Sequence, residues 1–136
     1  MDVIDLIGRI LFAVLFWQNG WNHLRNRAGT VAFAHTFRAP YPEVTVPLTG
    51  VVMVVCGTLV AIGVWADLAA LLLAIFVVVA AYYAHAYWKE TDQYVRAAQQ
   101  AQFMKNIAIA GACLFLLALF QQFHDGMKLT LGGSFF

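Results

Sequence analysis

The chain has 136 residues, of which 62% are hydrophobic and only 11% carry a charge. A soluble domain averages about 25% charged residues, so this composition excludes an ordinary soluble protein and is typical of one embedded in membrane lipids. The formal net charge of +1 gives no reason to expect nucleic acid as a partner.

Four apolar stretches are long enough to predict membrane-spanning helices, at about residues 3–21, 47–65, 68–85 and 103–123. The first follows Asp2 and Asp5, where a cleavable signal peptide would carry positive charge. We therefore expect it to be a retained anchor. The predicted fold is all-α, a single-domain membrane four-helix bundle with antiparallel up-down topology.

The connections between spans one and two and between spans three and four predict short helices at the membrane surface. Residues 28–38 have apolar positions that could lie flat on the membrane, and Pro40 and Pro42 end that segment. Residues 89–102 are polar but rich in Ala and Gln, which predicts a second short surface helix. The turn between spans two and three is expected around residues 66–67. The C-terminal tail is expected to fray or adsorb to the membrane.

Basic residues predict the orientation of the bundle. Six lie in or beside the connections between spans one and two and between spans three and four: Arg25, Arg27, Arg38, Lys89, Arg96 and Lys105. Only Arg9 and Lys128 belong to the side of the termini. The positive-inside rule therefore predicts that both connections face the cytoplasm and that both termini lie outside.

Arg9 lies well inside the first apolar run, where an unpaired charge is costly. Asp5 is one helical turn earlier on the same face, which predicts an Asp5–Arg9 ion pair that snorkels outward. Two alternatives stay open: Arg9 contacts an anion or the carbonyl oxygen of a ligand, or it contacts a partner subunit.

A second polar group, the cytoplasmic-edge set, gathers at one membrane level. Its members are Gln18, Asn19, Asn22, His23, His85, Trp88, Lys105 and Asn106. In one interpretation they tie the helix ends together by hydrogen bonds. In the other they form a pocket for a small molecule, where His85 exchanges a proton and Lys105 or Asn106 holds a carbonyl oxygen.

The remaining residues with reactive side chains predict no catalytic or metal site. His23, His35, His85 and His124 show no ligand spacing, and no nucleophile stands beside a histidine. Cys56 and Cys113 lie mid-span without a CxxC motif and are expected to be small buried residues rather than a disulfide.

Several motifs, taken in order, resemble the DoxX family of small four-helix membrane proteins. They are Gly8-Arg9, Gly20 with Asn22-His23-Leu24, Pro40, the glycines 50, 57 and 63, His85-x-x-Trp88, and Phe103-x-Lys105-Asn106 followed by Gly111. The resemblance covers almost the whole chain. Met53 stands where the family often has a Glu, and Cys56 and Ala112 replace common glycines.

The resemblance implies a multi-pass protein of the bacterial cytoplasmic (inner) membrane. Some DoxX proteins resemble the membrane subunit of a thiosulfate:quinone oxidoreductase, which implies a quinone-linked subunit that works with a membrane or peripheral partner protein. The chain has no flavin, haem or iron–sulfur motif, so quinone is the one cofactor considered. The alternative is a non-catalytic accessory subunit of a larger membrane complex, and an oligomer is possible for either. A transporter fits worst, because no proline or charge interrupts the spans at mid-membrane.

Overall fold

The computed structural model describes residues 2–123 and 130–135, and within them it is helical without a strand. The elements are α1 (Asp2–Arg25), α2 (Arg27–Thr36), α3 (Pro42–Ile62), α4 (Ala66–Ala84), the short 3-10 helix η1 (Tyr87–Lys89) and α5 (Gln93–Phe123). By length and composition, α1, α3, α4 with its continuation to Lys89, and α5 could each cross a membrane. The predicted all-α fold with four spans is confirmed.

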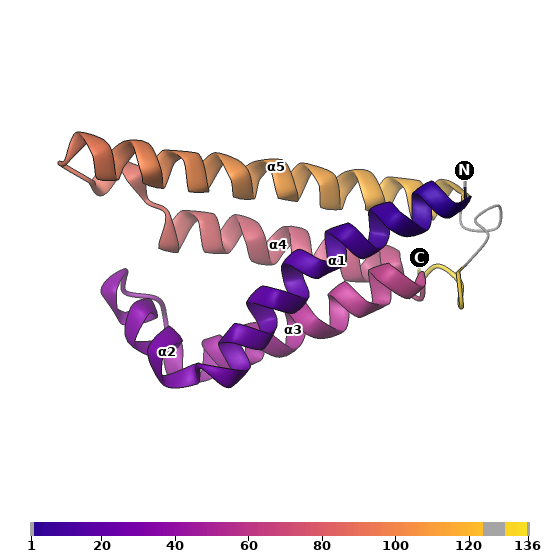
Figure 1. The fold of residues 1–136 in the computed structure, drawn as a ribbon, viewed down its shortest axis with the longest axis horizontal. Helices are drawn as coiled ribbons and strands as arrows, with labels where there is room; N and C mark the ends of the chain where they lie inside the picture. The colour runs from indigo at the N-terminus through magenta and orange to yellow at the C-terminus, as the bar shows by residue number, and fades with distance from the viewer. Residues whose placement is uncertain (1, 124–129, 136) are drawn as a thin grey trace.

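The long helices form two pairs, and α3 packs against α4 to join them. In one pair α1 packs on α3, and in the other α4 packs on α5. Figure 1 shows that the chain reverses direction between successive long helices. The pairs lie close together near the termini and diverge toward the end that carries α2 and η1. This divergence creates the space in which the candidate site lies.

The start of α3 differs from the predicted start at Pro47. Tyr41 adopts the left-handed conformation at φ 46°, and Pro42 occupies the first helical turn, where proline needs no hydrogen-bond partner. Pro47 therefore lies inside α3 and cannot donate to the Glu43 carbonyl four residues earlier. Arg27 on α2 supplies the missing donor, since its Nη2 lies 2.8 Å from that oxygen. The contact satisfies the carbonyl that Pro47 leaves without a main-chain donor.

The sequence predicts a separate surface helix for the polar segment before span four. This prediction is wrong, because the segment forms the first part of α5. The Asp92 carboxylate accepts hydrogen bonds from the main-chain N–H groups of Tyr94 and Val95, both at 2.9 Å, and caps the helix. From there no Gly or Pro interrupts the chain before Gly111. α5 has 31 residues and is therefore about 46 Å long, well beyond the thickness of a bilayer core.

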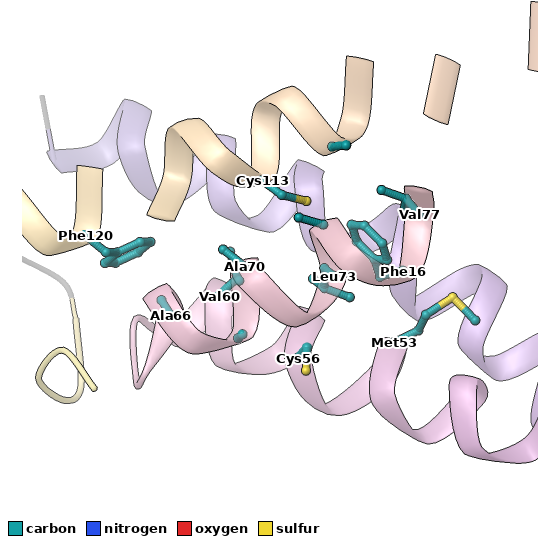
Figure 2. Packing of buried hydrophobic residues seen from close by; sticks show 13 residues of the cluster. Phe16, Met53, Cys56, Val60, Ala66, Ala70, Leu73, Val77, Cys113 and Phe120 are labelled. Carbon is teal, nitrogen blue, oxygen red and sulfur yellow. The ribbon is translucent and has the colours of Figure 1, made fainter. Parts of the chain in front are cut away.

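The core lies between the two pairs and depends on small side chains of α4. Ala66, Ala69 and Ala70 are at most 1% exposed, which lets the neighbouring helices approach closely. Figure 2 shows the larger core residues around them and the two cysteines well apart. Cys56 and Cys113 are buried and free, as predicted.

Residues 130–135 fold over the turn between α3 and α4. That turn lies at residues 63–65, earlier than predicted, where Gly63 and Trp65 both have positive φ. The Leu131 N–H donates to the Ile62 carbonyl at 2.9 Å, and the Phe135 N–H donates to the fully buried Asp67 carboxylate at 2.9 Å. The prediction of a frayed or adsorbed tail is wrong for these residues, because their main-chain N–H groups donate to acceptors at the turn.

Candidate functional site

A cavity of about 400 Å³ lies where the two helix pairs diverge. α1 and α3 line one side and α4 and α5 the other, while Phe33 of α2 and Phe37, just after the end of α2, complete the lining. The part of the lining nearest mid-membrane is apolar and includes Phe16, Met53 and Ile109. Polar side chains are confined to the end near α2 and η1.

His23 of α1 lines the cavity and is fixed by α3. Its Nδ1 lies 3.1 Å from the Thr49 hydroxyl and 3.3 Å from the Val46 carbonyl. The carbonyl can only accept, and the Thr49 hydroxyl itself donates to the Thr45 carbonyl at 2.8 Å. Nδ1 therefore carries the proton. In the neutral ring, Nε2 is then a hydrogen-bond acceptor.

His85 closes α4 on the opposite side of the cavity. Its Nδ1 donates to the Gln99 side-chain oxygen on α5 at 2.8 Å. This bond ties the end of α4 to the part of α5 that extends beyond the predicted span. It also leaves Nε2 of the neutral ring as an acceptor, as in His23.

Lys105 and Asn106 supply donors from α5, and Asn19 supplies an acceptor from α1. The Lys105 ammonium donates to the Gln102 side-chain oxygen one turn earlier and keeps two further protons. One N–H of the Asn19 amide donates to the Leu15 carbonyl at 2.7 Å, so its second N–H and its oxygen remain available. The cavity thus combines an apolar interior with donors and acceptors at one end.

The DoxX family profile matches residues 4–86 of the chain. The chain is a member of the DoxX family. It is 30% identical over 114 residues to the inner membrane protein YphA of Escherichia coli (strain K12), covering 84% of this chain and 81% of that protein. No solved structure matches. The profile match contains His23 and His85 but ends before Lys105 and Asn106.

In this DoxX protein the cavity brings together five residues of the cytoplasmic-edge set: Asn19, His23, His85, Lys105 and Asn106. Gln18 and Asn22 instead line a shallow polar groove on the outer side of α1, together with Arg25. Trp88 is 44% exposed and stacks against Phe103 and Tyr82 at centroid distances of 5.7 Å. In the part of the chain that the structure describes, the residues of the cytoplasmic-edge set therefore do not form a single hydrogen-bonded network.

Arg9 lies far from this cavity, near the turn between α3 and α4. The predicted ion pair is present, with Nη2 3.1 Å from the Asp5 carboxylate. The predicted outward path is wrong, because Arg9 is 1% exposed and its Nη1 donates to the Ala61 carbonyl at 3.0 Å. A side chain at Gly63 would come within 3.0 Å of Nη1, so the glycine gives Arg9 its space.

Sequence reasoning missed the residues that shape the site indirectly. Thr49 and Gln99 orient the two histidines, and their only signal was their place near the ends of spans. The sequence predicts that Phe33 and Phe37 belong to a surface helix, whereas both also line the cavity. Within residues 2–123 and 130–135, no three His, Cys, Asp or Glu side chains could hold a metal ion. His124 lies outside the described residues.

Proposed function

We propose that this DoxX-family protein binds the head of a membrane-soluble quinone in the cavity and acts as the membrane subunit of a quinone-linked redox system. The observation that carries the proposal is the cavity itself, which joins an apolar interior to polar groups from α1, α4 and α5. A cavity of about 400 Å³ is within the usual range for small-molecule sites.

The polar groups suit the chemistry of a quinone head. Lys105 and Asn106 can donate hydrogen bonds to a carbonyl oxygen, and the imidazoles of His23 and His85 can accept hydrogen bonds from the hydroxyls of the quinol. Reduction of a quinone to a quinol takes up two protons and two electrons. The sequence has no motif for a flavin, haem or iron–sulfur cluster, so the electrons would come from a partner protein.

The cavity lies at the end of the bundle where the basic residues gather. By the positive-inside rule this end faces the cytoplasm, and both termini lie on the other side. The relative in Escherichia coli is an inner membrane protein, which supports the same membrane for this chain. A cytoplasmic or peripheral redox protein would then reach the cavity from the side of α2 and η1.

The direct test is equilibrium binding of a short-chain quinone to the purified protein in lipid nanodiscs. His85→Ala and Lys105→Ala should each weaken binding about tenfold, because each removes one hydrogen-bonding group from the polar end. His35→Ala is the matched control, since His35 is exposed and pairs with Glu43 outside the cavity lining. Absence of saturable binding to the unaltered protein would contradict the proposal.

The polar groove on α1 favours a second candidate, an accessory subunit of a larger membrane complex. Gln18, Asn22 and Arg25 are exposed on a helix that could cross the membrane. Polar side chains are costly against lipid and commonly pair with a neighbouring helix. This candidate predicts co-migration with a large complex on native gels, and Gln18→Leu with Asn22→Leu should abolish that migration without altering quinone binding.

A further inference from the structure

We infer that the cavity prefers the reduced, hydroxyl-bearing form of its ligand over the oxidised, carbonyl-bearing form, and that His23 is the principal acceptor for a ligand hydroxyl. This inference rests on the proposed function and adds the redox state of the bound substrate. It depends on which hydrogen-bonding atoms the protein has already engaged and which it leaves for a ligand.

The engaged atoms of the two histidines are donors. His23 donates from Nδ1 to Thr49 and Val46, and His85 donates from Nδ1 to Gln99. A neutral imidazole has one donor and one acceptor, so both rings keep only their acceptor, Nε2. Among residues 2–123 and 130–135, neither Nε2 has a hydrogen-bond partner.

The other polar groups of the lining are less restricted. One N–H of the Asn19 amide donates to the Leu15 carbonyl, which leaves its second N–H and its oxygen available. Donors are thus present on three helices, from Asn19, from the Tyr83 hydroxyl of α4, and from Lys105 and Asn106 of α5. The two histidine Nε2 atoms differ from these groups because, in the neutral ring, they can only accept.

A hydroxyl group can donate to these acceptors, whereas a carbonyl oxygen cannot. A hydroquinone has two hydroxyls and a quinone has none, although both can accept from Lys105 or Asn106. The reduced form thus makes hydrogen bonds that the oxidised form cannot replace. Among the acceptors, His23 is held most firmly, because Thr49 and Val46 both fix its ring from α3.

The experiment compares a benzoquinone that carries one short isoprenoid unit with its hydroquinone. Binding to the unaltered protein is measured in phosphatidylcholine nanodiscs under anaerobic conditions at about pH 8. The expected result is roughly tenfold tighter binding of the hydroquinone, the effect of one additional satisfied hydrogen bond. His23→Ala should bring the ratio of the two affinities close to one.

Thr49→Val tests the same point without removing the imidazole. It keeps the side-chain volume and removes the oxygen that orients Nδ1. Because Thr49 also lines the cavity, the readout is the ratio of the two affinities, which should fall two- to threefold (roughly one weakened hydrogen bond). Thr58→Val is the matched control on α3, because Thr58 accepts from Trp17 and is not a cavity-lining residue. It should leave the ratio unaltered.

The possible outcomes separate this inference from the proposed function. Equal affinity for the two forms overturns the redox preference and leaves quinone binding standing. An unchanged ratio in folded His23→Ala and Thr49→Val proteins overturns the role of His23. Failure of both ligands to bind the unaltered protein overturns the proposed function and this inference together.

Discussion

Arg27 on α2 donates from Nη2 to the main-chain carbonyl of Glu43 at 2.8 Å, four residues before Pro47. In an unbroken helix the N–H of residue 47 would occupy that carbonyl, but proline has none. The Arg27 side chain thus supplies the hydrogen-bond donor that α3 lacks at Pro47, and it also links α2 to α3. α2 contributes to the cavity lining, so this contact also holds part of the site in place.

Arg27→Ala should lower the stability of the protein by about 1 kcal/mol, since the Glu43 carbonyl loses its donor. In a Pro47→Ala background the same substitution should have a smaller effect, because an alanine at this position restores the main-chain donor. A double-mutant cycle of thermal unfolding in one detergent measures this coupling. Strictly additive effects would show that Arg27 does not compensate for Pro47.

Arg9→Met should destabilise the protein by about 3 kcal/mol, because it leaves the Asp5 carboxylate and the Ala61 carbonyl without their buried partner. Asp5 is 24% exposed, so Asp5→Asn should cost less. Thermal unfolding measures both. Quinone affinity of the folded Arg9→Met protein should be unchanged, and a large loss of affinity would favour a direct contact between Arg9 and the ligand.

Asp67→Asn should loosen residues 130–135 from the turn between α3 and α4. The Asp67 carboxylate accepts from the Phe135 N–H and the Ser134 hydroxyl, and a neutral amide accepts more weakly. Hydrogen–deuterium exchange should therefore show faster deuterium uptake in the peptide that contains Leu131 and Phe135. Ser134→Ala, which removes one of these bonds, should have a smaller effect. Unchanged uptake in both variants would show that Asp67 does not hold the tail.

Hydropathy was sufficient to predict the four spans and the all-α fold. In a membrane, long apolar runs must satisfy their main-chain groups internally, so helices were the expected solution. The ends of the helices were harder to predict. α3 begins at Pro42 with Pro47 inside it and Arg27 bound to the Glu43 carbonyl, and α5 includes the polar segment after Asp92. Both outcomes depend on contacts that a local pattern does not contain.

The sequence predicted the end of the bundle at which the candidate site lies, but not which residues line it. Sequence order placed eight polar residues at one end of the bundle, and five of them line the cavity. Helix rotation decides the rest: His23 lines the cavity, Asn19 borders both the cavity and the groove on α1, and Gln18 and Asn22 line that groove alone. The cavity itself results from the divergence of the two helix pairs, which no single segment of the sequence encodes.

The measurement that tests the central claim most directly is the titration of a short-chain quinone into the nanodisc-embedded protein and its Ile109→Trp and Ile107→Trp variants. Ile109 lines the cavity, and Ile107 is 38% exposed on α5 outside the lining. An indole at position 109 should fill the cavity and abolish binding, while the same side chain at position 107 should leave saturable binding intact. Equal binding by both variants, or no binding by the unaltered protein, would contradict a quinone site in this cavity.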